Sequence, residues 1–327
     1  MKKQRMLTGD RVTGKLHLGH YVGSLKNRVR LQDQYETFVL LAEALTTHFD
    51  KPGLIRSHLR EVALDYLAVG INPDHATIVV QSMIPEIAEL TVLFSMFVTV
   101  NALRHNPTIK SESKSSGLDE MYYGFLGYPV SQTADITFCK AAIVPVGEDQ
   151  LPHLELTRKI VRRFNELYRP VLVEPKPLVG DIPRLVGTDG NAKMSKSLGN
   201  SIMLDSSPEE IALKIRRAVT DPARIRKNDP GHPDHCPIYA YHLAFRKEGA
   251  AEIRESCEQG SMGCSECKQR ITAAIEQLLA PMQERRSYYA GRPKRIDDIL
   301  VAGTERARTI ARETMLEVRE AMSLNYF

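Results

Sequence analysis

The sequence predicts an α/β fold for the first two-thirds of the chain and an all-helical region after it. Short apolar runs alternate with segments of helical periodicity up to Pro170, as in a parallel sheet covered by helices. Beyond Pro208 the helical periodicity continues, but strand-like runs become rare. With 327 residues, the chain is long enough for one large domain and a smaller one.

In the first part, strands and helices are expected to alternate, with an error of about 2–4 residues at each end. The predicted strands are 6–8, 37–41, 76–80 and 142–146, and the predicted helices are 19–34, 54–69, 84–98 and 149–164. Prolines at 170, 175, 177 and 183 rule out a continuous helix and predict an extended connector. The polar stretch 187–200 is predicted to be a surface loop, and the last helix is predicted at 304–322.

The composition is that of a soluble globular protein, with 43% hydrophobic and 26% charged residues. The formal net charge of +4 permits an anionic partner such as RNA without requiring one. No apolar stretch resembles a signal peptide or reaches membrane-spanning length. A cytoplasmic location is therefore expected, and in that reducing compartment the five cysteines are not expected to form a disulfide framework.

The segment Thr13–His20, of sequence TGKLHLGH, follows the first predicted strand and opens a helix. Backbone N–H groups at a helix start form a natural phosphate site, and Gly19 would let a base or ribose approach closely. His17 and His20 share one face of the first turn, so both can donate to phosphate oxygens. A helix start with two surface histidines fits about as well, but the carboxyl end of a parallel strand favours a ligand site.

The stretch Gly190–Asn200, of sequence GNAKMSKSLGN, places Lys193 and Lys196 three residues apart between glycines. A mobile loop with two cations can close over a triphosphate and hold the departing pyrophosphate. The alternative interpretation is a solvated basic loop.

These two segments together resemble a known family. His-Leu-Gly-His at 17–20 and Lys-Met-Ser-Lys-Ser at 193–197 are the signature pair of the class I aminoacyl-tRNA synthetases. Further segments resemble tryptophanyl-tRNA synthetases, so that the resemblance covers nearly the whole chain: 9–24, 44–48, 128–136, 144–158 and 221–224.

The resemblance implies a Rossmann-type nucleotide-binding catalytic domain over 1–185, with the last helix as a candidate to pack back on it. It also implies a mobile loop over 186–204 and a C-terminal helical, anticodon-binding domain over 205–327. The implied activity is that of a homodimeric tryptophan–tRNA ligase, which activates tryptophan with ATP and Mg²⁺ and transfers it to tRNA(Trp). Basic residues near the start of the helical domain would add to a tRNA surface: Arg216, Arg217, Arg224, Arg226 and Lys227.

The family's site residues can be placed on the matching positions of this sequence. The implied catalytic residues are His17, His20, Lys193 and Lys196. The implied ATP contacts are Arg11, Val12, Thr13, Gly19, His20, Gly147, Glu148, Asp149, Lys193, Met194, Ser195, Lys196 and Ser197. The implied tryptophan contacts are Leu7, Tyr128, Gln132, Asp135, Ile136, Val144, Val146 and Gln150. Asp135 would accept the indole N–H; taken without the flanking segments, it would instead be read as a helix-surface carboxylate or as part of a structural hydrogen bond.

Two departures from the family pattern concern this site. Val12 stands where the family usually has proline, which removes no functional group. The segment Leu41–Glu43 is shorter than usual, so that one pocket residue is either missing or replaced by Glu43. Tyrosine-specific relatives share the pattern Tyr-x-x-x-Gln-x-x-Asp, so a tyrosine-specific synthetase stays open, although segment 144–158 favours tryptophan. A non-catalytic, synthetase-like RNA-binding protein also stays open.

Four cysteines cluster in the helical region: Cys236, Cys257, Cys264 and Cys267. Thiolates so spaced suit a tetrahedral zinc ion or an iron–sulfur cluster, and separate buried thiols are the alternative. Spacing alone favours zinc. A subgroup of tryptophanyl-tRNA synthetases, however, has C-x(22)-C-x(6)-C-x(2)-C around a [4Fe–4S] cluster, and here the last two gaps match while the first has 20 residues. We therefore expect an iron–sulfur cluster, and expect Cys139 to be a packed core residue.

Overall fold

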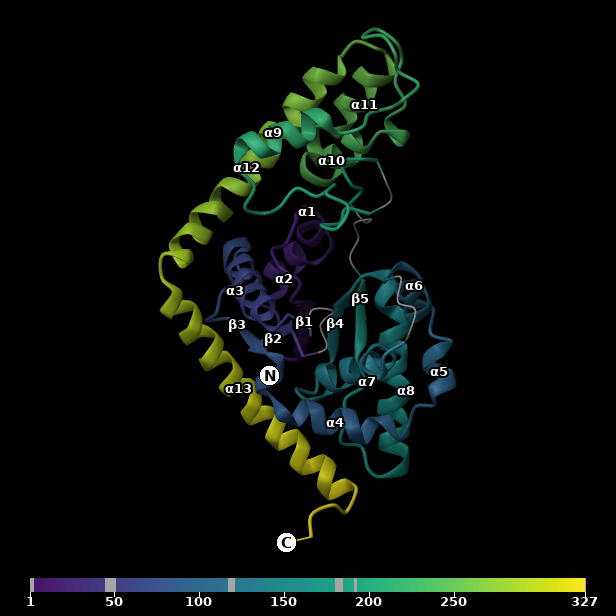
Figure 1. Cartoon of the computed structure of the whole chain (residues 1–327), viewed down its shortest axis with the longest axis vertical. Coiled ribbons are helices and arrows are strands. Elements are labelled where there is room, and N and C mark those ends of the chain that lie inside the picture. The colour runs from purple at the N-terminus through teal and green to yellow at the C-terminus, as the bar shows by residue number, and fades with distance from the viewer. Residues whose placement is uncertain (1–2, 45–50, 117–120, 180–184, 191–192, 327) are drawn as a thin grey trace.

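A computed structural model describes residues 3–44, 51–116, 121–179, 185–190 and 193–326. Parts of the sequence predictions lie outside these ranges, namely Leu45–His48, Pro183 and Asn191–Ala192. The described chain forms an α/β body with a helical region at one end, and two long helices run along one side (Figure 1). None of the described helices is long and apolar enough to cross a membrane.

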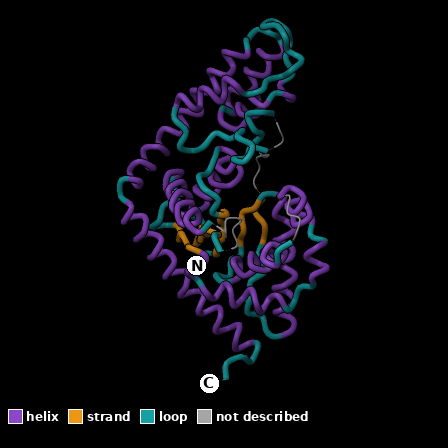
Figure 2. The backbone as a smooth tube through the Cα atoms, in the orientation of Figure 1, coloured by secondary structure: helices purple, strands orange, loops and turns teal. Residues whose placement is uncertain are grey.

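Five parallel strands form the central sheet, in the order β3-β2-β1-β4-β5 (Figure 2). The strands are β1 Arg5–Arg11, β2 Glu36–Ala42, β3 Ala76–Val80, β4 Ile143–Val146 and β5 Lys176–Val179. The chain builds β2 and β3 on one side of β1 and then returns to build β4 and β5 on the other. The strand order therefore switches between β1 and β4, and a ligand site is expected outside their carboxyl ends. The α/β prediction is confirmed.

The edge strand β5 was not predicted. It forms in the segment that was expected to be an extended connector, and its Pro177 pairs with Val144 of β4. Proline cannot donate to a neighbouring strand, but an edge strand tolerates it. The prolines thus exclude a helix, as predicted, but they do not exclude this strand.

Helices connect the strands of the sheet. They are α1 Leu18–His20, the π-helical turn η1 Tyr21–Leu25, α2 Lys26–Leu31, α3 Pro52–Val69, η2 Gln81–Met83, α4 Pro85–Ser95, α5 Val100–Arg104, α6 Pro107–Ser116, α7 Tyr123–Thr137, η3 Glu148–Gln150 and α8 Leu151–Leu167. The predicted helices correspond to α1–α2, α3, α4 and α8. Helix α7, which carries Tyr128 and Asp135, was not predicted, because its second half is buried nearly all round and shows no amphipathic period.

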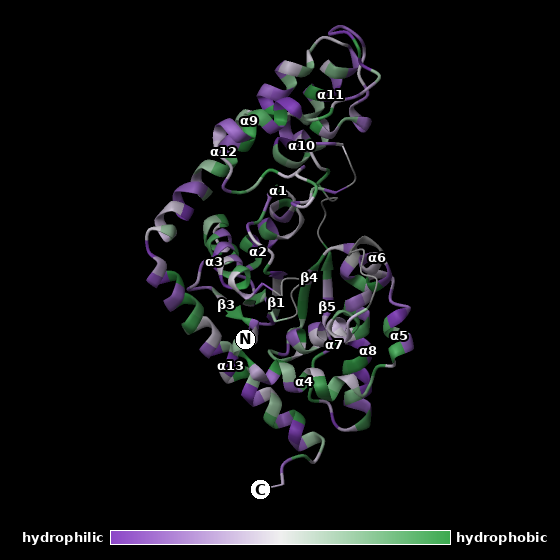
Figure 3. Ribbon diagram, in the orientation of Figure 1, coloured by the Kyte–Doolittle hydropathy of each residue, from purple (hydrophilic) through white to green (hydrophobic). Residues whose placement is uncertain are grey.

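Beyond β5, the described residues form helices and loops. The helices are α9 Pro208–Arg217, η4 Pro233–His235, α10 Pro237–Phe245, η5 Lys247–Gly249, α11 Ala250–Glu258, α12 Cys264–Ala290 and α13 Pro293–Ala321. Apolar and polar residues alternate along α13, which returns to the α/β body (Figure 3). There the hydroxyl of Thr304 accepts a hydrogen bond from Val80 N (3.1 Å). Gly303 permits this contact, since a Cβ there would lie 2.2 Å from the Ile78 carbonyl oxygen.

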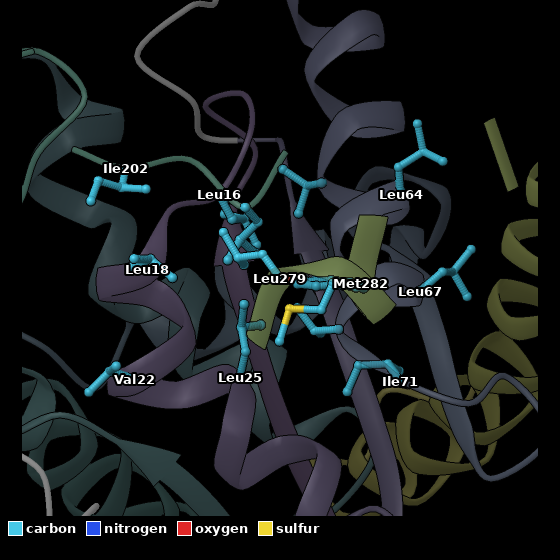
Figure 4. Packing of buried hydrophobic residues seen from close by; sticks show 14 of the residues in the cluster. Leu16, Leu18, Val22, Leu25, Leu64, Leu67, Ile71, Ile202, Leu279 and Met282 are labelled. Atoms are coloured by element: carbon cyan, nitrogen blue, oxygen red, sulfur yellow. The ribbon is translucent and has the colours of Figure 1, made fainter. Parts of the chain in front are cut away.

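One hydrophobic cluster joins the helical region to the α/β body (Figure 4). Leu16 and Leu18, next to β1, are at most 1% exposed, as is Ile202 from the loop before α9. Leu279 and Met282 of α12 belong to the same cluster. Because burial of such side chains contributes about 1.5–3 kcal/mol each, this shared core fixes α12 against the segment that follows β1.

Candidate active site

The first loop, residues 13–17, leads from the carboxyl end of β1 into α1. Nδ1 of His17 accepts a hydrogen bond from Gly19 N (3.1 Å), and Nδ1 of His20 accepts one from His17 N (3.2 Å). Since both Nδ1 atoms accept, each neutral ring carries its proton on Nε2. Burial lowers the pKa of His17 to about 3 and that of His20 to about 4. Both rings are therefore neutral hydrogen-bond donors at pH 7.

Gly19 holds these two rings in place. A Cβ at this position would lie 2.9 Å from the ring of His17, and the rings of His17 and His20 are only 3.9 Å apart. The sequence argument for Gly19 was the close approach of a nucleotide. The structure adds a second reason, because a side chain here would displace His17.

The second loop, residues 193–200, contacts the first loop through Lys196. The ammonium group of Lys196 donates to Thr13 O (2.8 Å), Thr13 Oγ1 (3.1 Å) and Gly14 O (3.2 Å). Burial lowers the pKa of Lys196. Lys193 and Lys196 also add to the effect of burial and of His20 in lowering the pKa of His17. The structure thus brings the two lysines and the two histidines to one place.

Asn200 organises this second loop. Its side-chain oxygen accepts from Ser195 N (2.7 Å), and its amide donates to Lys193 O (3.2 Å) and to Asp189 Oδ1 (2.9 Å). Met194, which was predicted as an ATP contact, is buried at 1% exposure. The loop is therefore an ordered turn with Lys196 seated on the first loop, in contrast to a simple solvated basic loop.

Asp135 lies on the buried side of α7, at 7% exposure. Its Oδ1 accepts a hydrogen bond from Gln81 Nε2 (2.7 Å), and Gln81 Oε1 accepts from Ala44 N (3.1 Å). Burial raises the pKa of Asp135 to about 7, against the hydrogen bond from Gln81 and with a contribution from the charge of Glu43. Gln81 was missed in the sequence, although it directly follows β3 at the carboxyl edge of the sheet.

Glu43, from the shortened segment after β2, is near this carboxylate. Its Oε1 accepts from Ser82 N (2.8 Å), and its Oε2 is buried without a hydrogen-bond partner. A buried carboxylate oxygen without a partner is costly. The structure thus places the Glu43 carboxylate near Asp135, and its replacement of a pocket residue stays a prediction.

Tyr128 contacts side chains from α6, from α8 and from the end of β1. Its hydroxyl lies 2.7 Å from His153 Nε2 and donates to Glu112 Oε2 (3.0 Å). Arg11 Nη2 in turn binds Glu112 Oε1 (2.9 Å), and the Arg11 guanidinium lies 5.1 Å from the centre of the Tyr128 ring. Glu112 and His153 were missed, because α6 and α8 bring them here from separate parts of the sequence.

The remaining predicted residues occupy three environments. Leu7, Ile136 and Val144 are core residues at most 5% exposed. Val12 is also fully buried. The half-buried residues are Thr13, Gln132, Val146, Gln150 and Ser195, whereas Gly147, Glu148 and Ser197 are exposed. The side chain of Asp149 lies outside the description.

The four clustered cysteines line a single enclosed cavity together with Arg224. Arg224 Nη1 lies 3.7 Å from Cys257 Sγ and 3.8 Å from Cys264 Sγ, so this arginine points into the cavity and away from the predicted basic surface. Among the described residues, no group of three or more His, Cys, Asp or Glu is placed to hold a metal ion. Cys139 is fully buried in the other core cluster, as predicted.

The sequence is similar to those of known proteins over its whole length. A model of the class I tRNA synthetases (W and Y) matches residues 1–280. The tryptophan–tRNA ligase of Thermotoga maritima is 46% identical over 328 residues, which cover 98% of this chain and 100% of the relative. The tryptophan–tRNA ligase of Clostridium longisporum is 47% identical over 337 residues, which cover 100% of this chain and 99% of the relative.

Solved structures give the same result. Tryptophanyl-tRNA synthetase from Campylobacter jejuni, complexed with ADP and tryptophan, matches with a TM-score of 0.85 and 29% identity over 98% of this chain and 99% of that one. Tyrosyl-tRNA synthetase from Archaeoglobus fulgidus shares the fold at a TM-score of 0.69 and 22% identity, over 88% of this chain and 90% of that one. The fold and the two loops thus define a class I tRNA synthetase of the tryptophan and tyrosine type. Within that class, the chain belongs to the tryptophan–tRNA ligase family.

Proposed function

We propose that the chain activates tryptophan with ATP and transfers it to tRNA(Trp) in the cytoplasm. The observation that carries this proposal is the contact of Lys196 with the first loop, directly beside His17 and His20. A phosphate-binding loop closed by a cation from a second loop is what nucleotidyl transfer needs. The full-length similarity to tryptophan–tRNA ligases, at 46–47% identity, supports tryptophan over tyrosine.

In the proposed reaction, the tryptophan carboxylate attacks the α-phosphorus of ATP. A bond forms between the carboxylate oxygen and phosphorus, and the bond to the leaving pyrophosphate breaks. Nε2–H of His17 and of His20 would donate to phosphate oxygens, while Lys193 and Lys196 would stabilise the leaving group. Mg²⁺, when bound with ATP, would neutralise further charge on the phosphates. A hydroxyl oxygen of the terminal ribose of tRNA would then attack the carbonyl carbon of the adenylate. An ester bond forms, the bond between the carbonyl carbon and the phosphate oxygen breaks, and AMP leaves.

The pocket proposal has a pH-dependent consequence. Because Asp135 has a pKa raised to about 7, it is largely ionised at pH 8 and largely protonated at pH 6. Protonation removes the charge that strengthens its hydrogen bond to the indole N–H. We expect the KM for tryptophan in pyrophosphate exchange to rise as the pH falls from 8 to 6.

The matched variant for this test is Glu43→Gln. The negative charge of Glu43 contributes to the raised pKa of Asp135, so removing it should shift the midpoint of the KM profile to lower pH. An Asp135→Asn variant should show a flat profile. A profile that is the same in all three proteins would show that Asp135 is not the titrating pocket group.

For the cysteine cavity we propose a [4Fe–4S] cluster, with zinc as the alternative. Four thiols around one cavity fit either group, and Arg224 beside two of them would offset the negative charge of a thiolate set. Four thiolates could hold either a zinc ion or an iron–sulfur cluster. The spacing of the cysteines, whose last two gaps match the iron–sulfur pattern, favours the cluster over zinc.

Metal analysis of protein purified without oxygen tests this proposal. We expect about four iron and four sulfide per chain and an absorption band that dithionite bleaches. Cys257→Ser should lose both, and Cys139→Ala should retain both. Stoichiometric zinc without sulfide would support the alternative, and a metal-free protein with normal folding would contradict either group.

We also propose that the chain is a homodimer that uses the surface of η2, α4 and the start of α5. Four large apolar side chains are exposed along these elements: Met83 at 61%, Val92 at 68%, Met96 at 83% and Val100 at 57%. Exposed apolar side chains gathered in one segment suggest an interaction surface. Light scattering should give twice the chain mass, and Met96→Asp should halve it. Val301→Asp, at an exposed apolar position on α13, should remain dimeric; a monomeric wild type would contradict the proposal.

A further inference from the structure

A buried carboxylate on α3 holds the backbone of the first loop. Asp65 is 1% exposed, and its Oδ2 accepts a hydrogen bond from Leu16 N (2.6 Å). Leu16 immediately precedes His17, whose ring orientation depends on backbone N–H groups of the same turn. A shift of the Leu16 backbone would therefore move His17.

The other oxygen of Asp65 belongs to a contact with the helical region. Arg286, near the end of α12, donates from Nη1 to Asp65 Oδ1 (2.7 Å). The side chain of Arg286 is only 12% exposed, and its other nitrogen pairs with Glu61 and lies 3.8 Å from Asp205. Asp205 in turn pairs with Lys15 of the first loop (2.5 Å). Asp65 and Asp205 thus connect one arginine of α12 to both residues that precede His17.

Helix α12 extends this connection to the cysteine cavity. It begins at Cys264, and Arg286 is 22 positions later, which is about 33 Å along a helix. The first turns of α12 line the cavity with Cys264 and Cys267, and its later part packs on Leu16 through Leu279. One continuous helix, with Pro281 inside it, therefore runs from the cysteine cavity to the first loop.

We propose that Arg286 is a positioning residue that sets the geometry of the first loop, through Asp65, from the helical domain. The proposal rests on the proposed role of that loop in binding ATP. Lys196 holds the first loop at Thr13 and Gly14. On the other side, Asp65 contacts Leu16 and Asp205 contacts Lys15. Of these three side chains, only the two carboxylates also contact Arg286 of α12.

The test compares Arg286→Gln with Arg60→Gln. Arg60 also joins α3 to the C-terminal helices, through an exposed ion pair with Asp297 on α13 (3.0 Å), but it does not touch the first loop. In Arg286→Gln we expect the dissociation constant and the KM for ATP to rise about 10-fold, within the usual range of coupling between sites. The KM for tryptophan should stay within about twofold, and Arg60→Gln should resemble the wild type for both substrates.

Hydrogen exchange gives a direct second readout. The amide of Leu16 should lose protection in Arg286→Gln and keep it in Arg60→Gln, because only the first variant weakens the hold of Asp65. Arg286→Lys keeps the charge but loses the forked contact, so its ATP affinity and its Leu16 protection should lie between those of the wild type and of Arg286→Gln. It replaces the glutamine variant if that variant does not fold. Unchanged ATP binding together with unchanged Leu16 protection would overturn the proposal. The dissociation constant for ATP and the hydrogen exchange of Leu16 are both measured without amino acid. A wild type that does not activate tryptophan would therefore refute the proposed function and leave this test intact.

Discussion

Lys196→Ala is expected to slow tryptophan activation by about 10²–10³-fold, the loss seen when one preorganised donor to a transition state is removed. In the structure this ammonium group is bound by three oxygens of the first loop, next to His17. ATP phosphates can replace these acceptors as the pyrophosphate departs. In the proposed role the lysine would act mainly on the transition state, so the tryptophan dissociation constant should change little.

Single-turnover formation of the adenylate, together with equilibrium binding of tryptophan, separates these effects. Lys294→Ala, which removes an exposed lysine at the start of α13, should behave like the wild type. Equal losses in the activation rate and in tryptophan affinity would argue against a role for Lys196 in holding the leaving group.

Asp135→Asn is expected to lower kcat/KM for tryptophan by about 100-fold, since hydrogen bonds to charged groups contribute about 1.5–3 kcal/mol. The variant keeps the size of the side chain and an oxygen for Gln81 Nε2, but it loses the charged acceptor for the indole N–H. The KM for ATP should be nearly unchanged, because the nucleotide is proposed to bind at the first and second loops and Asp135 lies on α7.

The matched control for Asp135 is Asp74→Asn, an exposed carboxylate in the turn before β3. It should leave both kinetic constants within about twofold of the wild type. If Asp135→Asn raised the KM for ATP as much as that for tryptophan, the carboxylate would have a general structural role and would not define the pocket.

Local sequence patterns were sufficient to predict most of the sheet. Strands β2 and β3 are apolar runs that are almost wholly buried, as such runs predict, whereas β1 is buried over Met6–Thr8 and β4 only at Val144. The edge strand β5 was not predicted, because its residues are exposed and include Pro177. Helix α7 was not predicted, because its second half is buried on almost every side and so lacks an amphipathic period.

The site was predicted to the extent that it lies in short continuous motifs. The loops that carry His17 and Lys196 are such motifs, and the structure brings them together. The contacts that support them are not local, since Arg286 and Asp65 are 221 positions apart. Sequence patterns extend over short segments, so they cannot predict a contact between residues so far apart. Arg224 illustrates the same limit, because a residue expected on a basic surface points toward two cysteines.

Amino-acid-dependent ATP–pyrophosphate exchange tests the central claim most directly. Purified protein would be assayed with tryptophan, with tyrosine and with each of the other amino acids at saturating ATP and Mg²⁺. The account predicts exchange with tryptophan alone, because Asp135 is proposed to accept a ring N–H and the two loops are proposed to bind ATP. Exchange driven by tyrosine, or no exchange by folded protein that binds ATP, would contradict it.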